Sequence, residues 1–263
     1  MNITSFNELI TFKQIQIHRP KHQYPKNDVQ WGDFLSGLID GDGWISRKED
    51  QPKICICFHE KDVSLAYKIK EFLGYGTVSK CKGKRAFKYI LTSRLGLAKF
   101  CRIVKNTQVL EKRKRIFDLC KSLNIPTLEN KEKIESFLLN SYWLAGFIDA
   151  DGHLKIYIRY RKDRPHPFVL LTITIEQNVK NEQILIKLKQ IIGGSLYYSL
   201  KKNSVCYSSN SLQNTKKLIN YLDLFHLCSN KYKEYVIWRR AFLHRNNLIK
   251  IKRFQNRLKS LRK

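Results

Sequence analysis

The chain has 263 residues, 43% of them hydrophobic, and a formal net charge of +28 from 50 lysines and arginines against 22 acidic residues. This length allows one large domain or two small ones, and so large a charge on a chain of ordinary apolar content indicates a folded protein that binds a polyanion. No window reaches the ~18 consecutive apolar residues of a membrane-spanning helix, so nucleic acid is favoured as the partner over a membrane. On charge alone, a ribosome-associated or merely basic protein stays open as an alternative.

Residues 1–26 are predicted to form a poorly constrained N-terminal arm. They lack the apolar core of a secretory signal and are poor in the arginine and serine of a transit peptide. The seven cysteines include no C-x-x-C pair, and the nearest approach is Cys55-x-Cys57. This pattern disfavours a zinc ribbon or a disulfide framework and favours a reducing compartment.

The first distinctive stretch, FLSGLIDGDGWIS from residue 34, predicts a helix that ends at Gly43. Gly37 and Gly41 lie four residues apart, on one side of this helix. A glycine inside a helix costs roughly 1 kcal/mol relative to alanine, so both glycines need a packing reason. Small residues at i and i+4 supply one, because they let two helix backbones approach closely.

An alternating strand, KICICFHE, follows, and then an amphipathic helix that ends at Gly74. Two shorter strands and two helical stretches complete this predicted first half, which spans residues 27–123. Asparagines and a proline then break the helical periodicity, which predicts a linker over residues 124–131.

The distinctive stretch returns as WLAGFIDADGHLK. Six of nine positions are identical between Leu35–Gly43 and Leu144–Gly152, and the same order of elements follows, with about ten extra residues between the first two strands. Such an internal repeat predicts a second half over residues 132–245. Residues 246–263 are predicted to form a basic, helical tail.

Asp42 and Asp151 fall in the last turn of the two repeated helices. If these helices pair in parallel, the two carboxylates converge, although a helix C-terminus disfavours anions and neighbouring carboxylates repel. A magnesium ion between them fits, because it is a hard ion that takes oxygen ligands and few protein contacts. In a very basic protein this site predicts phosphodiester hydrolysis. Asp40 and Asp149 are interpreted as helix-end caps rather than ligands.

Both stretches resemble the doubled signature of LAGLIDADG homing endonucleases that carry two motifs in one chain. The resemblance covers roughly residues 28–245. It implies an α+β fold of two pseudosymmetric αββαββα halves, with a two-helix motif interface and saddle-shaped antiparallel sheets over DNA. It also implies double-strand cleavage with Mg²⁺, for which we expect Mn²⁺ to substitute. Because both halves are present, we expect a monomer.

The resemblance assigns metal binding to Asp42 and Asp151, with help from the backbone carbonyls of Gly41 and Ala150. These four residues are therefore the predicted metal site, and the two aspartates are also counted as catalytic.

Further catalytic residues follow from the same resemblance. The family often has a glutamine where the second strand enters the next helix; the second half has Gln177 there, and we align Glu60 with it as a departure. The family also has a basic residue near the site, for which we choose Lys112 and Lys231 over the basic residues that follow each. Such a lysine would stabilise charge on the scissile phosphate; a generic phosphate contact is the alternative.

Alternation along the strands after each motif predicts one polar face in each half. We expect these faces to hold phosphates and read base edges, with a merely solvated face as the alternative. Because the two faces differ, the preferred DNA site should be asymmetric. The predicted DNA-binding residues are Trp44, Ser46, Lys48, Lys53, His59, His153, Lys155, Tyr157, Arg159, Arg161, Thr172 and Thr174.

These observations predict a site-specific double-strand DNA endonuclease encoded in an organellar intron. The alternative is an intron-encoded RNA maturase that assists splicing of its host group I intron and therefore binds intron RNA. An intein endonuclease is disfavoured because no splicing-junction residues are recognised. A regulatory DNA-binding protein on this scaffold would be expected to lack one of the two motif aspartates, Asp42 or Asp151.

Overall fold

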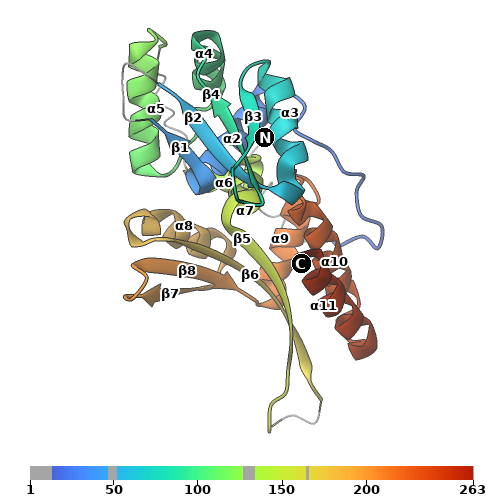
Figure 1. The fold of residues 1–263 in the computed structure, drawn as a ribbon. Coiled ribbons are helices and arrows are strands. Elements are labelled where there is room, and N and C mark those ends of the chain that lie inside the picture. Colours follow the sequence, from blue (N-terminus) through green and yellow to red (C-terminus); the bar gives the residue numbers. More distant parts are fainter. Residues whose placement is uncertain (1–13, 47–51, 127–133, 164–165, 263) are drawn as a thin grey trace. The chain divides into compact units, whose positions relative to one another are not determined.

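The computed structural model in Figure 1 describes residues 14–46, 52–126, 134–163 and 166–262. Contacts divide the chain into two compact units. The first, here called the motif unit, comprises residues 23–151 and 228–230. The second, here called the hairpin unit, comprises residues 14–22, 152–227 and 231–262. Both repeated helices thus belong to the motif unit. The predicted boundaries follow the sequence repeat instead and place the second of these helices in the second half.

The motif unit contains one four-stranded antiparallel sheet with the strand order β1-β2-β4-β3. Its elements are α2 (Asp28–Asp42), β1 (Gly43–Ile45), β2 (Ile54–His59), η1 (Glu60–Asp62), α3 (Val63–Leu73), β3 (Thr77–Lys80), β4 (Ala86–Leu91), α4 (Arg94–Ile103), α5 (Leu110–Ser122), α6 (Ile134–Asn140) and α7 (Trp143–Asp151).

The hairpin unit contains a second antiparallel sheet with the corresponding order β5-β6-β8-β7. Its elements are β5 (Gly152–Arg159), β6 (Phe168–Asn178), η2 (Val179–Asn181), α8 (Glu182–Ile192), β7 (Ser195–Ser199), β8 (Ser204–Ser209), α9 (Leu212–Leu222), α10 (Lys231–Leu243) and α11 (Leu248–Arg262). The predicted plan of helix, two strands, helix, two strands and further helices is therefore confirmed in both halves.

The motif helices α2 and α7 pack backbone against backbone. A Cβ atom added to Gly37 would fall under 3.0 Å from the carbonyl oxygen of Trp143, and one added to Gly146 would fall equally close to that of Phe34. Phe34 and Trp143 are repeat equivalents, as are the two glycines, so the contacts are reciprocal. This is the pseudo-twofold pairing that the sequence predicted, and it explains why glycine is tolerated inside both helices.

The sheet of the motif unit has one apolar face. Ile54, Ile56 and Phe58 of β2 are buried, whereas Cys57 and His59 are exposed, which confirms the predicted alternation. The amphipathic helix α3 contacts β2, β3 and β4 and ends at Gly74, which adopts a left-handed conformation with φ of 77°. The helix end predicted at this glycine is confirmed.

The hairpin of β5 and β6 extends beyond the rest of its sheet (Figure 1). Phe168–Thr172 of β6 pairs with β5 alone, because the pairing with β8 starts at Ile173. The backbone of β5 also accepts side-chain hydrogen bonds from α10 and α11, which protects it from pairing with another chain. The donors are Trp238 to Lys155 O, Gln255 to Ile156 O and Arg262 to Leu154 O.

The described part of the N-terminal arm is held in place, contrary to the prediction that it is poorly constrained. Gln16 O accepts a hydrogen bond of 2.8 Å from Arg239, and His22 Nε2 lies 2.9 Å from Leu227 O. The ring of His22 also packs against that of Tyr232, with 4.2 Å between centroids. The sequence did not predict these contacts, because a segment without helical or strand periodicity carries no local sign of what it packs against.

The predicted helical tail is confirmed as α11, which buries Ile251 and Leu258. Of the predicted linker over residues 124–131, the structure describes residues 124–126, where Asn124 has a positive φ of 56°. Among the residues that the structure describes, no helix is both long and apolar enough to cross a bilayer.

Substituting Gly37→Ala tests the close packing of the motif helices. Helix propensity alone predicts a gain of about 1 kcal/mol in unfolding free energy. We expect a loss of about 2–4 kcal/mol instead, because the new methyl group would overlap the Trp143 carbonyl. Chemical denaturation measures the change, and Asn256→Ala at an exposed position of α11 is the control. A stabilised Gly37→Ala protein would contradict the packing.

Candidate active site

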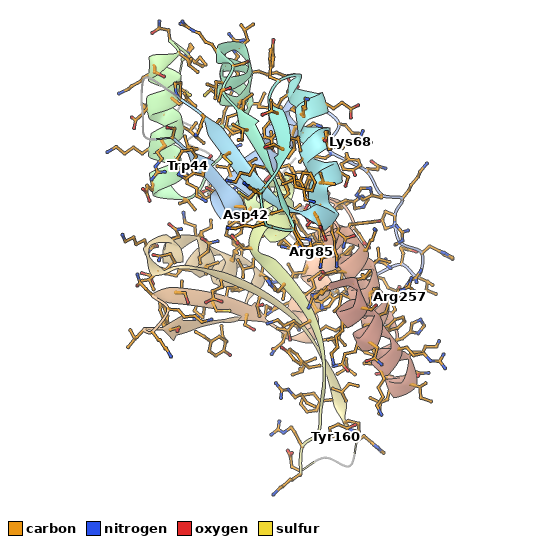
Figure 2. All side chains as sticks on the ribbon, in the orientation of Figure 1. Asp42, Trp44, Lys68, Arg85, Tyr160 and Arg257 are labelled. Atoms are coloured by element: carbon orange, nitrogen blue, oxygen red, sulfur yellow. The ribbon has the colours of Figure 1, made fainter. Side chains whose placement is uncertain are left out.

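Asp42 and Asp151 are the last residues of the two motif helices. The helices run in parallel and their ends meet: a Cβ atom added to Gly41 would overlap the side chain of Ala150 and lie 2.7 Å from Oδ2 of Asp151. Figure 2 shows Asp42 at the end of α2; this side chain is exposed, and Asp151 is half-buried. The structure therefore brings together the residues predicted to hold the metal.

Lys112 of α5 caps the end of α2. Its Nζ atom donates to the carbonyl oxygens of Ile39, Asp40 and Gly41, each at 2.7 Å. These contacts use all three N–H groups of the ammonium and satisfy carbonyls in the last turn of the helix. The positive charge also opposes the negative end of the helix dipole. The choice of Lys112 as the basic residue beside the motif agrees with this position.

The same lysine lies in the field of several carboxylates. Burial lowers the pKa of Lys112, and the charges of Asp40, Asp151 and Asp42 act in the opposite direction and raise it. The ammonium is thus electrostatically coupled to both acids that are predicted to hold the metal. It reduces the mutual repulsion of carboxylates gathered at two helix ends.

Asp40 anchors the segment that precedes α5. Its buried carboxylate accepts hydrogen bonds from the backbone N–H groups of Gln108 at 2.6 Å and Val109 at 3.0 Å, and from the indole of Trp143 at 2.8 Å. The predicted cap at the end of its own helix is therefore wrong: Asp40 instead holds the two residues that precede α5. Because Val109 directly precedes α5, this anchor positions Lys112.

Asp149 makes the corresponding contacts in the second copy. Its carboxylate accepts from the backbone N–H groups of Cys228 at 2.6 Å and Ser229 at 3.2 Å, and from the Ser229 hydroxyl at 2.6 Å. The hydroxyl takes the place of the indole, since the position equivalent to Trp143 is a phenylalanine. Lys231, the first residue of α10, directly follows the anchored segment 228–230. Its contact with the site stays a prediction.

The predicted alignment of Glu60 with Gln177 is wrong by two residues. Gly43 pairs with Ile56 and Gly152 with Ile175, so the repeat offset grows from 109 in the first strands to 119 in the second. The ten additional residues agree with the predicted insertion. With this offset, the counterpart of Gln177 is not Glu60 but Phe58, two residues earlier.

Side-chain caps mark the correct alignment. His59 accepts a hydrogen bond from the N–H of Lys61, and Asn178 accepts one from the N–H of Lys180, each at the start of a 3₁₀ turn. The two capping residues are 119 positions apart. Both side chains are of types that can cap a turn, and this was the local signal that the alignment overlooked.

Glu60 and Gln177 also differ in their surroundings. Glu60 forms an ion pair with Arg85, and this hydrogen-bonded guanidinium holds the pKa of Glu60 below its usual value. Gln177 is buried and accepts a hydrogen bond of 3.3 Å from Asn181. Their predicted catalytic roles therefore stay predictions, and the two residues are not counterparts in the repeat.

In the motif unit, the predicted DNA-reading residues lie on or beside the polar face of the sheet. Trp44 is 46% exposed, and Nζ of Lys53 lies 5.4 Å from the centre of its ring. His59 is exposed and Ser46 is half-buried. Lys48 lies outside the described residues.

In the hairpin unit, the predicted face is exposed at His153, Tyr157 and Arg159, with the Arg159 guanidinium 5.2 Å from the Tyr157 ring. Arg161 follows the end of β5 and pairs with Asp163. The remaining predicted residues are less accessible: Lys155 and Thr174 are half-buried and Thr172 is only 5% exposed. Figure 2 shows that the far end of the hairpin carries Tyr160, which is 71% exposed.

Comparison with known families supports this geometry. The sequence profile described as LAGLIDADG endonuclease matches residues 35–123 and again residues 144–242. The chain belongs to this family. It is 37% identical over 245 residues to the cox1 intron-2 37.2 kDa protein of Schizosaccharomyces pombe, covering 89% of this chain and 72% of that protein.

Other relatives carry functional names. The chain is 28% identical to the intron-encoded RNA maturase bI4 of Saccharomyces cerevisiae, over 77% of this chain and 30% of that protein. It is 24% identical to the probable intron-encoded endonuclease aI2 of Debaryomyces hansenii, over 78% of this chain and 32% of that protein. The chain thus spans about a third of the length of these two relatives.

Solved structures of LAGLIDADG meganucleases share the fold. The structure of I-AabMI bound to uncleaved DNA has a TM-score of 0.65 and 20% identity, covering 88% of this chain and 98% of that one. The structure of I-SmaMI bound to an uncleaved DNA target in the presence of calcium ions has a TM-score of 0.60 and 17% identity, covering 88% and 97%. The predicted fold of two pseudosymmetric halves is confirmed.

The donors at the motif of this LAGLIDADG chain fit a hard cation in part. The carboxylates of Asp42 and Asp151 are oxygen donors at adjoining helix ends. Across the described residues, no cluster of three or more His, Cys, Asp or Glu side chains could hold a metal. The carbonyl of Gly41 already accepts a hydrogen bond from the Lys112 ammonium, so a metal there would meet a like charge. The two carboxylates are therefore the donors that fit a metal ion. The predicted metal contact of the Ala150 carbonyl stays a prediction.

Replacing Lys112 by methionine removes the cap while keeping a long side chain. We expect the unfolding free energy to fall by about 3 kcal/mol, because three carbonyls in the last turn of α2 lose a charged donor. Lys114→Met, at an exposed position of the same helix, should change it by less than about 0.5 kcal/mol. Equal effects of the two substitutions in denaturant titrations would contradict the capping role.

Asp40 should make stability depend on pH. Burial raises the pKa of Asp40 to about 6, although its hydrogen bonds and Lys112 oppose the rise. An unfolded aspartate has a pKa of ~3.9, so the extra stability of the protonated form is complete below about pH 4 and lost as the pH rises through 6. The advantage of wild type over Asp40→Asn in unfolding free energy should shrink by about 2 kcal/mol from pH 4 to 7. A constant difference would contradict the raised pKa.

Proposed function

We propose that the protein is a site-specific DNA endonuclease that hydrolyses one phosphodiester in each strand of a long asymmetric site. We propose Mg²⁺ as its metal, with Mn²⁺ able to substitute. The observation that carries the proposal is the meeting of Asp42 and Asp151 at the ends of two parallel helices whose backbones touch. Two acids and two related halves match a reaction that must be carried out twice, once on each strand.

We assign different roles to the aspartates and to the lysine at this site. Asp42 and Asp151 would hold the metal, which, when bound, polarises the phosphoryl group and lowers the pKa of a coordinated water. Lys112 acts as a positioning residue, because all three of its N–H groups are engaged by backbone carbonyls. Its charge still adds a positive field close to both carboxylates.

Double-stranded DNA is the proposed substrate. The net charge of +28 favours a polyanion, and relatives of the same fold were solved with DNA bound. The polar faces of the two sheets differ: one offers Trp44, Lys53 and exposed cysteine, the other a histidine, a tyrosine and Arg159. Different donors on the two faces would read different half-sites, which supports an asymmetric target.

Intron RNA is the second candidate partner. The relative named an intron-encoded RNA maturase matches over 77% of this chain, and a charge of +28 would attract RNA as well as DNA. The names of several relatives state that they are intron-encoded, and one names a cox1 intron. We therefore propose that an intron of an organellar gene encodes the protein, and that it acts as a monomer.

Cleavage of a library of random DNA inserts tests the proposal. Purified protein is incubated with the library in Mg²⁺, Mn²⁺ or Ca²⁺, and all new ends are sequenced. We expect reproducible double-strand ends at one long asymmetric sequence in Mg²⁺ and Mn²⁺. Asp42→Asn and Asp151→Asn should each lower double-strand cleavage by at least about a hundredfold, because each removes a charged metal ligand.

Asp118→Asn is the matched control, since Asp118 is an exposed acid of α5 and carries no predicted role. It should cleave like the wild type, and thermal unfolding should show that all three variants are folded. Cleavage retained in both motif variants would contradict the assignment of the site. A folded wild type that cuts no member of a deep library but accelerates splicing of its host intron would establish the maturase instead.

A further inference from the structure

A basic groove lies in the hairpin unit between the N-terminal strap, defined as residues 16–22, and the helices α10 and α11. Three cavities of about 590, 420 and 290 Å³ follow it. They share lining residues and therefore form one continuous feature: Ile17 links the first two, Arg19 and Tyr232 link the first and third, and Arg240 lines all three.

The charge of the groove has one sign. None of the residues that line the three cavities is acidic. Two acids close to the groove pair with arginines: Asp223 with the buried Arg239, which also lines the first cavity, and Glu234 with Arg262. The exposed cations of the groove are Arg19, Lys21, Lys233, Arg240, Lys250, Arg253 and Arg257.

The helix α11 contributes a row of these cations. Its sequence, LIKIKRFQNRLKSLR, contains six lysines and arginines and no acid. Lys250, Arg253 and Arg257 are spaced at i, i+3 and i+7, so they share one face and follow one another at about 4.5–6 Å along the axis. Figure 2 shows Arg257 on this helix. Like charges so close repel one another unless an anion lies between them.

The strap holds the groove open in a defined shape. Arg239 donates to Gln16 O, and the ring of His22 packs against those of Tyr232 and His226. Arg19 donates to the Tyr232 hydroxyl and lies over the same ring. Ile17 remains 81% exposed although it lines two of the cavities. A preformed groove needs little ordering when it binds a ligand.

The groove is separate from the face predicted to read DNA. On α10, Tyr232, Val236 and Arg240 line the groove, whereas Trp238 and Phe242 are buried on other sides of the helix. Trp238 donates to the backbone of β5, so α10 places the sheet on one side and the groove on another.

We propose that this groove binds a single strand of nucleic acid through its phosphates, while a duplex occupies the sheet face. Closely spaced cations suit the successive phosphates of a strand. Residues of the strap and of two helices line the groove, and a flexible strand can adapt to such a lining more readily than a rigid duplex. RNA and DNA share the recognised chemistry, and the experiment separates them.

Fluorescence anisotropy of three labelled probes tests the groove with the full chain: a uridine RNA and a thymidine DNA of roughly 20 nucleotides, and a DNA duplex of the same length. The groove variant is Arg240→Gln/Arg253→Gln/Arg257→Gln. The charge-matched control is Lys70→Gln/Arg102→Gln/Lys105→Gln, which removes three exposed cations of the motif unit. The sheet variant is Lys155→Gln/Arg159→Gln. Each protein is measured between about 50 and 200 mM salt.

We expect the groove variant to bind single strands at least about tenfold more weakly than the control does, with a salt slope reduced by about 2. Its duplex affinity should equal that of the control, and the sheet variant should show the opposite pattern. Equal losses of affinity for single-stranded RNA and DNA would show that the groove recognises the phosphates. A loss of affinity for RNA alone would show that it also recognises the ribose 2′-hydroxyl.

Two results would overturn the proposal: single-strand binding by the groove variant that matches the control, or equal weakening for single strands and duplex. Cleavage has no part in this measurement, so a failure of the proposed nuclease activity would leave its outcome readable. Thermal unfolding of all the variants would show whether the substitutions disturb the fold.

Discussion

The contact between the backbones of α2 and α7 is the constraint on which the site depends. Gly37 and Gly146 leave no room for a side chain, because each faces the carbonyl of the other helix. This spacing continues along the helices until Gly41 meets Ala150, and the two terminal aspartates follow directly. Larger residues would separate the axes by the thickness of a side chain and the carboxylates with them. Glycine therefore destabilises each helix but permits the close approach that brings the two acids together.

Ending two adjoining helices in carboxylates is unfavourable, and the surrounding residues counteract it. The last carbonyls of α2 receive the Lys112 ammonium, which opposes both the helix dipole and the repulsion between acids. The start of α5, which carries this lysine, is held by the buried Asp40. A buried carboxylate is tolerated when donors surround it, and Asp40 has three. One aspartate of each motif thus ends its helix at the proposed metal site, while the other, two residues earlier, holds a supporting segment.

The hairpin unit combines the same sheet plan with different attachments. Its long hairpin carries the predicted base-reading residues, and α10 and α11 join the edge of β5 through side-chain donors. The outer faces of these helices form the basic groove with the N-terminal strap. The named relatives include endonucleases and a maturase. If duplex and single strand bind to different faces of one unit, the same fold could support both activities.

The sequence by itself determined the elements and the two acids that end the motif helices, because helical and strand periods, glycine stops and a doubled motif are local signals. Family resemblance also predicted a basic residue beside the motif, with Lys112 as one of three candidates, and the structure places Lys112 there. Only the tertiary structure decided that Asp40 binds amides 68 and 69 residues away and that the strap packs on α10. It also replaced Glu60 by Phe58 as the counterpart of Gln177. The physical reason is that strand register and hydrogen-bond partners are chosen across the fold, where no local period records them.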